Sequence, residues 1–543
     1  MADAQKLVKI SIDDREIEVP AGTNVIEAAK MMGVEIPHYC YHPDLSIAGN
    51  CRMCQVEVEG MPKLEIGCNL MARDGLKVRT HESSDRVKES QAATLEFILI
   101  NHPLDCTVCD QSGHCKLQDY HYEYNARPSR FVEDKVQKVK AEPLGPHVIL
   151  DGERCIMCSR CVRFCDEITK TSEIGLVNRG DRTMIAVNPE RPLDNALSGV
   201  VVDLCPVGAL THRDWRFNTR IWYTRQVDSV CTGCSTGCNV KVAVRDDQVV
   251  QVKARYNEQV NKEWMCDEGR YGFDRFLPKQ RITQPTLGGQ PVEWDEAVSA
   301  ASKVRGQKAL VFLAPELLLE DFWTIKLFVE KELSESTVVL AYRERELSEV
   351  ERIIVSPDYA PNFRGAEFFS LVGGDLEGSY NAALNQVRTG TAQNVLILGR
   401  SAILPADLDE RFLTGLAQSQ LSVALIEDES SKLVQAAKII LPSRSCLERS
   451  GMMINRNKRL QYLERLMDAP MSTQPHWRAI NLMCGGNLVS AVSDRDVTLQ
   501  MLADTGAFKG LKIADVKGMG IDLARLPARD NGTGVGEADS VRG

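Results

Sequence analysis

Cysteines are the residues of this sequence most suited to chemistry. The chain has 18 of them among 543 residues, and all but Cys446 and Cys484 lie before residue 267. Residues 1–9 are charged and polar where a secretory signal would carry an apolar core, so we expect a cytoplasmic chain whose thiols stay reduced. Clustered thiols in such a compartment bind metals or carry redox chemistry rather than forming disulfides. These cysteines are therefore candidate metal ligands.

Spacing divides the candidate ligands into four sets of four. They are Cys40, Cys51, Cys54 and Cys68 (set 1); His102, Cys106, Cys109 and Cys115 (set 2); Cys155, Cys158, Cys161 and Cys205 (set 3); and Cys231, Cys234, Cys238 and Cys266 (set 4). Four thiolates hold an iron-sulfur cluster, and an imidazole in place of one thiolate makes the cluster easier to reduce. Structural zinc is the alternative for sets 1, 2 and 4. His114 is a poorer ligand than His102 because it adjoins Cys115 directly.

The third set leaves a choice between two cysteines. The run from Cys155 to Cys165 has the C-x2-C-x2-C-x3-C spacing of half a bacterial two-cluster ferredoxin, in which the fourth cysteine ligates the other cluster. The companion run is missing here, but a Cys-Pro pair remains at Cys205. We therefore expect Cys205 to complete set 3 and Cys165 to be a buried packing thiol. Cys165 as the fourth ligand is the alternative.

The elements that must position sets 1 and 2 are short. Alternating apolar and polar residues predict strands over 7–12, 16–19 and 55–59, with a turn at Asp13-Asp14. A helix is expected over 24–32, with Asn24 and Glu27 as a capping box and Gly33 as its stop. Helical spacing predicts a second helix over 84–100. Set 1 then lies on a loop of a small β-rich domain.

The pattern changes around set 4 and after residue 278. Residues 240–252 indicate a β-hairpin, which would return Cys266 to the other ligands of set 4. Apolar strands over 309–313, 337–341, 394–398 and 421–426 then alternate with helical stretches, which favours an α/β domain with a largely parallel sheet. The final stretch, 526–543, is rich in Gly, Asp and Arg and is predicted to be disordered.

Composition excludes some function classes. The chain is 43% hydrophobic and 26% charged, and no apolar run reaches the roughly 18 residues of a membrane-spanning helix. A net charge of -10 argues against wrapping nucleic acid. We expect neither a nucleic-acid partner nor a direct membrane span.

Taken in this order, the four sets resemble those of the large iron-sulfur subunit of NADH:quinone oxidoreductase, respiratory complex I. Set 1 is similar to plant-type [2Fe-2S] ferredoxins, except that ten residues instead of four separate Cys40 from Cys51, as in the complex I variant. Set 4 resembles the [4Fe-4S] site that opens molybdopterin oxidoreductases. Residues 441–461 are similar to the closing segment of the reduced molybdopterin-oxidoreductase-like domain of the complex I subunit.

The resemblance implies a multidomain α+β chain with one [2Fe-2S] cluster in set 1 and [4Fe-4S] clusters in sets 2, 3 and 4. No molybdopterin is expected, because Glu268 stands where molybdenum enzymes usually have a lysine. The implied domains are an N-terminal β-grasp [2Fe-2S] ferredoxin-like domain (1–83), a [4Fe-4S] domain with one histidine and three cysteine ligands (84–130), a ferredoxin-like [4Fe-4S] domain (145–222), a [4Fe-4S] domain of molybdopterin-oxidoreductase type (223–278), a C-terminal molybdopterin-oxidoreductase-like α/β domain (279–525) and a tail (526–543).

The resemblance also implies the activity and the partners. The chain would carry electrons, with no catalytic residues and no NADH site of its own. Its partners would be a flavin/NADH-binding subunit with its [2Fe-2S] partner, a ferredoxin-like two-cluster subunit and the quinone-site subunits of the peripheral arm. The complex would lie on the cytoplasmic side of the inner (cell) membrane, with this chain peripheral. The set 4 cluster would lie off the main electron path.

Other protein classes share part of the pattern. A formate dehydrogenase or nitrate-reductase-like subunit would bind molybdopterin, but the part after residue 278 is short for that architecture. An iron-only hydrogenase would need more cysteines than Cys446 and Cys484 for its active-site cluster. A diaphorase subunit of an NAD-reducing hydrogenase usually ends earlier. The non-enzymatic interpretation, which we favour for the C-terminal domain, is a docking scaffold.

Overall fold

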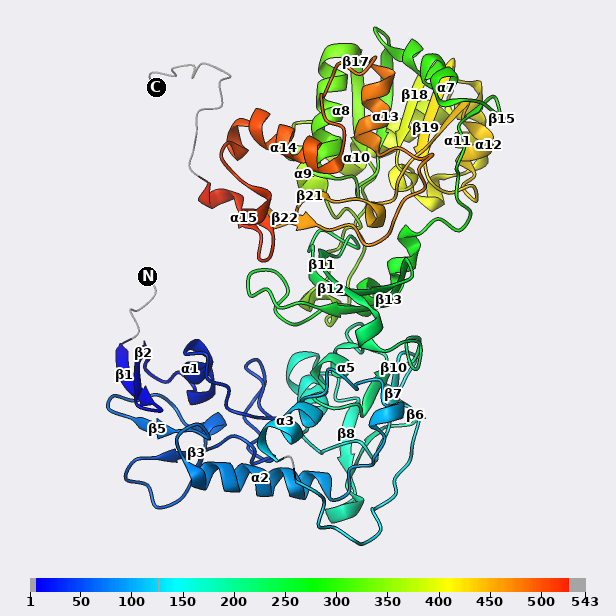
Figure 1. Ribbon diagram of the computed structural model, residues 1–543. Coiled ribbons are helices and arrows are strands. Elements are labelled where there is room, and N and C mark those ends of the chain that lie inside the picture. Colours follow the sequence, from blue (N-terminus) through cyan, green and yellow to red (C-terminus); the bar gives the residue numbers. More distant parts are fainter. Residues whose placement is uncertain (1–5, 126, 527–543) are drawn as a thin grey trace, which may run out of the picture. The chain divides into compact units, whose positions relative to one another are not determined.

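The computed structural model describes residues 6–125 and 127–526. It divides the chain into two compact units, one ending at Arg225 and the other beginning at Gln226 (Figure 1). Apart from Leu526, the predicted tail over 526–543 lies outside the described residues. Within the described ranges, every helix is too short or too polar to span a bilayer.

A five-stranded sheet opens the first unit and supports set 1. Its order is β2-β1-β5-β3-β4, with β1 (Leu7–Ile12), β2 (Arg15–Pro20), β3 (Gln55–Val58), β4 (Glu65–Ile66) and β5 (Lys77–Arg79). The three predicted strands are confirmed as β1, β2 and β3. Alternate residues of β1 are buried in one apolar core with helix α1 (Val25–Met31), which fixes the register of the strand.

Helix α1 lies within the predicted range of 24–32, with Asn24 and Met32 as its caps. The Asn24 side chain accepts a hydrogen bond of 2.9 Å from the backbone N–H of Ile26, and Gly33, with φ +76°, follows the last turn. The predicted capping box is wrong in its second half. Glu27 hydrogen-bonds the hydroxyl of Tyr41 instead of returning to the helix start.

Sets 2 and 3 lie on loops between short elements of the same unit. The helix predicted over 84–100 is confirmed as α2 (Asp85–Leu99), capped by Ser84. The other elements are α3 (Lys116–Tyr124), α4 (Arg160–Arg163), α5 (Val200–Leu204), the sheet β10-β7-β6 of Leu210–His212, Val148–Leu150 and Glu142–Pro143, and the pair β8 (Ile174–Val177) and β9 (Met184–Val187). Ligand loops thus make up much of this region.

The second unit begins with a three-stranded sheet of β11 (Arg225–Val230), β12 (Asn239–Arg245) and β13 (Gln248–Ala254). The predicted hairpin is confirmed: β12 and β13 pair antiparallel, and Asp246 and Asp247 turn between them with φ of 50° and 59°. Helix α6 (Asp267–Tyr271) starts directly after Cys266.

A seven-stranded sheet forms the body of the second unit. Its order is β15-β14-β20-β19-β18-β16-β17, of Gln290–Pro291, Thr286–Leu287, Ile439–Pro442, Leu421–Ile426, Asn394–Leu398, Lys308–Leu313 and Ser334–Leu340. The run from β20 to β17 is parallel, as the sequence predicts, and β14 joins it antiparallel. Helices α7 (Trp294–Ala301), α8 (Leu319–Glu332) and α13 (His476–Met483) pack together, and so do α10 (Leu376–Arg388), α11 (Glu410–Gln418) and α12 (Leu433–Ala436).

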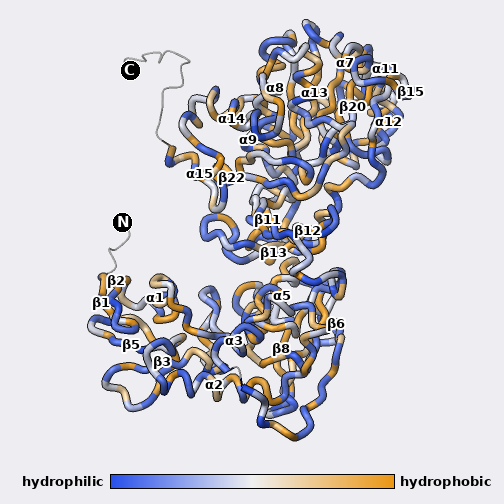
Figure 2. Tube along the Cα trace, viewed as in Figure 1, coloured by the Kyte–Doolittle hydropathy of each residue, from blue (hydrophilic) through white to orange (hydrophobic). Residues whose placement is uncertain are grey.

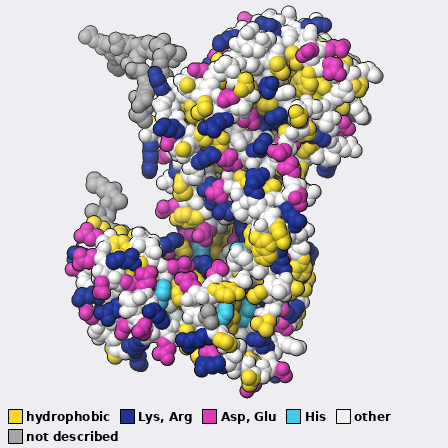
Figure 3. All heavy atoms as spheres, viewed as in Figure 1, with side chains coloured by type: hydrophobic (Ala, Val, Ile, Leu, Met, Phe, Trp, Pro, Cys, Tyr) yellow, Lys and Arg dark blue, Asp and Glu magenta, His cyan; other side chains and the backbone are white. Residues whose placement is uncertain are grey.

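These two helix groups bury the strands of the sheet in the largest core of the chain. Figure 2 shows apolar residues around β20 and α13. The remaining elements are α9 (Phe363–Phe368), α14 (Asp494–Asp504), α15 (Ile513–Val516) and the sheet β21-β22-β23 of Gly451–Ile454, Arg459–Leu463 and Ile521–Asp522. On the face drawn in Figure 3, acidic and basic side chains are interspersed.

Candidate metal centres

Set 1 lies on the loop between α1 and β3 and on the short turn after β4. The thiol of Cys51 donates a hydrogen bond to Cys40, which lowers the pKa of Cys40 to about 5. The thiol of Cys54 donates in the same way to Cys68 and lowers its pKa. Backbone N–H groups of Asn50 and Cys51 also hydrogen-bond the Cys40 sulfur. Cysteines 28 positions apart at their extremes are thereby gathered at one site.

The loop that carries Cys51 depends on left-handed backbone. Gly49 has φ +60° and Arg52 has φ +56°, so the chain turns sharply on both sides of Cys51. This turn directs backbone N–H groups toward sulfur, as the ligand loop of a cluster requires, because such hydrogen bonds stabilise the negative charge on the ligands.

Set 2 joins one exposed and two buried cysteines. Cys109 and Cys115 are buried, whereas Cys106 is exposed. Burial raises the pKa of Cys115 to about 11, and the N–H groups of Leu117 and Gln118 at the start of α3 oppose that shift. Burial also lowers the pKa of His102 to about 4, so its imidazole is neutral at pH 7, as a metal ligand must be. In the part of the chain that the structure describes, no hydrogen bond joins His102 to the three thiols.

Set 3 lines a single cavity. Cys155, Cys158, Cys161 and Cys205 all face it, together with apolar side chains such as Leu150, Ile185 and Leu210. Burial raises the pKa of Cys155 to about 12 and those of Cys158 and Cys205 to about 11. Thiols in such surroundings stay protonated unless positive charge compensates the thiolate, which iron ions would provide.

Cys165 lies outside this cavity. It sits in a short π-helical turn, Phe164–Ile168, that continues α4, and it is fully buried. Its side chain hydrogen-bonds the Thr169 hydroxyl. The structure therefore groups Cys205, rather than Cys165, with the first three cysteines of set 3.

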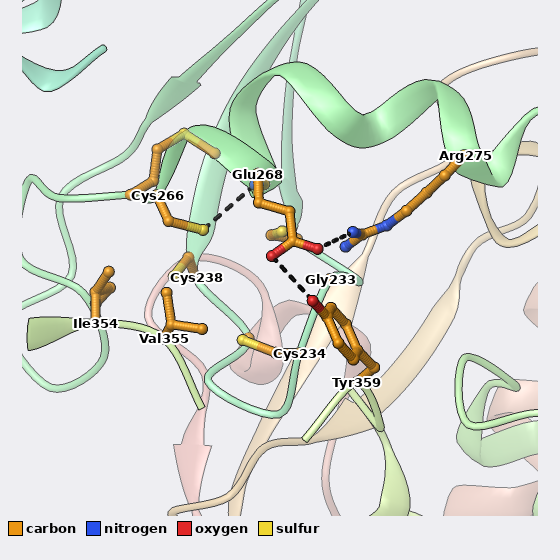
Figure 4. A pocket seen from close by; sticks show the side chains of 13 residues that line it. Gly233, Cys234, Cys238, Cys266, Glu268, Arg275, Ile354, Val355 and Tyr359 are labelled. Carbon is orange, nitrogen blue, oxygen red and sulfur yellow. Dashed lines mark hydrogen bonds and ion pairs between the residues drawn. The ribbon is translucent and has the colours of Figure 1, made fainter. Parts of the chain in front are cut away.

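Set 4 lines the cavity drawn in Figure 4. Cys231 follows β11 directly, and its backbone N–H donates to the carbonyl of Cys238 at 2.8 Å. Cys266 returns beside them after the β12–β13 hairpin, and its sulfur accepts a hydrogen bond of 3.3 Å from Gly269 N–H at the start of α6. The cavity, part of which is open to solvent, has an empty volume of about 410 Å³.

An acidic side chain lies beside set 4. Figure 4 shows Glu268 between Arg275 and Tyr359. Its carboxylate forms ion pairs of 2.6 Å with Arg275 and 3.2 Å with Arg345, and it accepts a hydrogen bond of 3.5 Å from the Tyr359 hydroxyl. Two arginines thus offset the negative charge that Glu268 brings to the edge of the cavity.

Among residues 6–125 and 127–526, no three His, Cys, Asp or Glu side chains lie close enough together to bind a single metal ion. In sets 3 and 4 the four sulfurs surround a cavity. Cluster ligands bind different iron atoms of one group and therefore surround a volume instead of a point. The donor types, the cavities and the N–H groups directed at sulfur fit iron-sulfur clusters.

The ligand loops of the first unit contact one another. One buried cluster of residues contains Cys40 of set 1, Cys115 of set 2 and Cys158 of set 3, and the partly buried Cys51, Cys155 and Cys205 pack against it. The Asn50 side chain donates to the carbonyl of Met157 at 3.1 Å, which joins the loops of sets 1 and 3. The thiol of Cys115 lies 4.0 Å from the carbonyl oxygen of Pro206, which joins sets 2 and 3. The loops of set 3 thus contact those of both other sets.

Sequence reasoning missed three further residues that contact the ligand loops, Arg160, Arg163 and Gly208. Arg160 and Arg163 lie between the spaced cysteines of the run from Cys155 to Cys165, and Gly208 follows Cys205 by three residues. A basic residue between ligand cysteines was the only available signal, and charge alone does not indicate burial.

Family models match four successive parts of the chain. Residues 5–83 match the 2Fe-2S iron-sulfur cluster binding domain, and residues 91–130 match the NADH-ubiquinone oxidoreductase-G iron-sulfur binding region. Residues 145–211 match the ferredoxin-like domain of NADH-quinone oxidoreductase subunit 3, and residues 224–277 match the molybdopterin oxidoreductase Fe4S4 domain. Proteins of similar sequence are named as subunits of NADH-quinone or NADH-ubiquinone oxidoreductase. One of them, an NADH-quinone oxidoreductase subunit from Rickettsia bellii, is 38% identical over 333 residues, which cover 60% of this chain and 48% of the relative.

The matched part of the chain is similar to subunits of NADH-quinone and NADH-ubiquinone oxidoreductases. A second relative, the mitochondrial NADH-ubiquinone oxidoreductase 78 kDa subunit of Candida albicans, is 40% identical over 309 residues, 55% of this chain and 42% of the relative. The chain spans about half the length of the large iron-sulfur subunits it matches. A solved chain of an NAD+-reducing [NiFe]-hydrogenase is 31% identical, with a TM-score of 0.36, over 39% of this chain and 91% of that one.

Proposed function

We propose that the chain carries electrons as a subunit of an NADH:quinone oxidoreductase. Set 1 would hold a [2Fe-2S] cluster, and sets 2, 3 and 4 would each hold a [4Fe-4S] cluster. The observation that carries the proposal is the shared burial of cysteines from sets 1, 2 and 3 in one group of packed residues. Electron transfer between centres requires short separations through packed protein, which this arrangement supplies. The names of the relatives support the same function.

We further propose the domain boundaries that the sequence predicts. They are 1–83, 84–130, 145–222, 223–278 and 279–525, with a tail over 526–543. The spans of the four family models, 5–83, 91–130, 145–211 and 224–277, support the first four.

The chain's own residues would set the properties of the centres. A bound cluster of this kind accepts and releases one electron at a potential that the protein tunes. Backbone N–H groups of Val207, Ala209 and Leu210 donate to the sulfur of Cys205, which stabilises negative charge there. Burial of Cys158 and Cys161, with partial burial of Cys155 and Cys205, limits the access of water to the site. No acid, base or nucleophile is needed for this task.

We propose a relay through sets 1, 3 and 2, which differs from their order in the sequence and is supported by contacts between the loops. Asn50 and Met157 link the first two of these, and Cys115 and Pro206 link the last two. Set 4 belongs to the second unit, and we propose that it lies off the main path. We propose a flavin/NADH-binding subunit with its [2Fe-2S] partner as the electron source and a ferredoxin-like two-cluster subunit as the acceptor. The quinone-site subunits and this chain would together occupy the cytoplasmic side of the cell membrane.

Metal analysis tests the proposal directly. The anaerobically prepared chain should contain about 14 iron atoms, which one [2Fe-2S] and three [4Fe-4S] clusters require, with matching acid-labile sulfide. Electron paramagnetic resonance (EPR) spectra at low temperature, recorded during stepwise reduction, should show one binuclear and three tetranuclear signals. Zinc in place of iron would overturn the proposal.

A variant tests the electron path in the assembled complex. Cys106→Ala should sharply reduce electron flow from NADH to quinone, because it removes a ligand of set 2. Cys484→Ala is the matched control, since Cys484 is buried in the core of the second unit and belongs to no ligand set. Equal flow in the Cys106 variant and the wild type would exclude set 2 from the path.

A further inference from the structure

Arg160 lies between the ligand loops of sets 1 and 3. It is the first residue of α4, it stands between two ligands of set 3 in the sequence, and only 7% of it is exposed. Its Nη2 donates to the carbonyl of Tyr41, directly after Cys40, and its Nη1 donates to the carbonyl of Leu204 at 3.4 Å, directly before Cys205. One guanidinium group therefore connects a ligand loop of each set.

This buried cation has no acidic partner. Among the residues that the structure describes, no carboxylate forms an ion pair with Arg160, and its Nε–H is buried without a hydrogen-bond acceptor. Arg154, which is also buried and precedes a set 3 ligand, differs: it forms ion pairs of 2.9 Å with Asp105 and 3.4 Å with Asp151. An uncompensated buried charge is strongly unfavourable, so a native fold that keeps one indicates a missing anion.

Ligand sulfurs are the groups that could supply the anion. Arg160 lines the set 3 cavity together with Cys155, Cys158, Cys161 and Cys205. The guanidinium remains protonated in proteins, so it presents a fixed positive charge to both sets.

We propose that Arg160 is a shared counter-charge for the clusters of sets 1 and 3, with its Nε–H donating to a sulfur at set 3. This inference rests on the proposed function. Four thiolates leave each centre with net negative charge, and reduction adds another. A positive charge between the two centres favours the reduced form of both. Arg160 therefore raises both reduction potentials and is a positioning residue for both loops.

The neighbouring Arg163 has a different environment. It is half-buried, and it donates to the carbonyls of Cys40, Cys158 and Ser46. Solvent screens its charge more than that of Arg160. Arg163 therefore mainly positions the loops.

Redox titration of the full-length chain, followed by EPR, tests the inference. Signals are assigned to sets 1 and 3 by their loss in Cys51→Ser and Cys158→Ser. At a fixed applied potential, Arg160→Gln should lower the ratio of reduced to oxidised cluster about tenfold at both sets, which corresponds to about 59 mV for a one-electron couple. Arg160→Lys retains the charge and should produce a smaller shift. Arg15→Gln is the control, because Arg15 is half-exposed and pairs with Glu82.

The outcomes separate this inference from the proposed function. A wild-type chain without iron and sulfide would overturn the proposed function. Clusters present at unchanged potentials in Arg160→Gln would overturn only the role of Arg160, and a shift confined to set 3 would overturn the shared role. If Arg160→Gln loses its clusters but Arg160→Lys retains them, the result supports the counter-charge role of Arg160. Equal loss of the clusters in both variants would overturn that role and assign Arg160 a purely structural one.

Discussion

Gly208 lies against the sulfur of Cys109 so closely that a Cβ atom at Gly208 would sit 2.1 Å from Sγ. Non-bonded atoms in proteins do not approach to that distance. Gly208 belongs to the segment that follows Cys205, and Cys109 is a proposed ligand of set 2. The absence of a side chain at Gly208 therefore lets the loops of sets 2 and 3 meet.

Substitution of Gly208 by alanine should disrupt set 2. The added methyl group would displace the Cys109 sulfur, so Gly208→Ala should lose the iron of one [4Fe-4S] cluster, about four atoms per chain. Iron and sulfide analysis measures the loss. Gly175→Ala is the control, because no atom lies within 4 Å of a Cβ at Gly175. Full iron content in Gly208→Ala would contradict the assignment of Cys109 as a ligand.

The choice between Cys165 and Cys205 can be decided in the same way. Cys205 lines the set 3 cavity and Cys165 does not. Cys205→Ser should therefore remove the set 3 signal from the EPR spectrum, whereas Cys165→Ser should retain it. The reverse pattern would make Cys165 the fourth ligand.

The second unit depends on a buried ion pair between Arg449 and Asp321. Their side chains are 2.6 Å apart, with 2% and 0% exposure. Asp321 also accepts hydrogen bonds from the N–H groups of Leu318 and Trp477. Asp321→Ala should lower the free energy of unfolding of this unit by about 3–5 kcal/mol, because it leaves the buried guanidinium of Arg449 with only a longer ion pair, 3.9 Å to Asp494.

Urea unfolding followed by tryptophan fluorescence measures that change. Glu330→Ala is the matched control, since Glu330 pairs with Lys326 at the surface, where such pairs contribute roughly 0.5 kcal/mol or less. Equal midpoints for the two variants would show that the Arg449–Asp321 pair does not stabilise the fold.

Stability of the second unit should fall as pH rises from about 4.5 to 7. Burial raises the pKa of Glu320 from its ordinary value of 4.5 to about 7, although Thr498 and the N–H of Met452 donate to its carboxyl group. The folded state then binds a proton that the unfolded state has lost, so the stabilisation present below pH 4.5 disappears as pH passes 7. A shift of this size corresponds to roughly 3 kcal/mol.

Glu320→Gln should flatten this part of the pH profile and raise the stability at about pH 8. Urea midpoints at several pH values on both sides of the Glu320 pKa provide the measurement. An unchanged slope in the variant would show that Glu320 does not titrate differently in the folded and unfolded states.

Much of the fold was predictable because local patterns encode local elements. Period-two alternation located β1 and the strand pairs of the hairpin, and apolar runs located the central strands β16, β18 and β19. The two-residue strands β14 and β15 were missed because two residues have no periodicity. The reciprocal bond expected from Glu27 was wrong because a residue distant in the sequence, Tyr41, competes for that carboxyl group.

The sequence by itself determined the candidate ligand types, their spacing and the proposed division into four sets, because candidate cluster ligands lie mostly on short loops. Only the tertiary structure decided which loops are neighbours: that the loops of set 3 contact those of sets 1 and 2, that Gly208 faces Cys109, and that Arg160 is buried between two sets without an acidic partner among the described residues. Such contacts arise from burial of apolar surface between distant segments, and neither spacing nor periodicity along the chain records that.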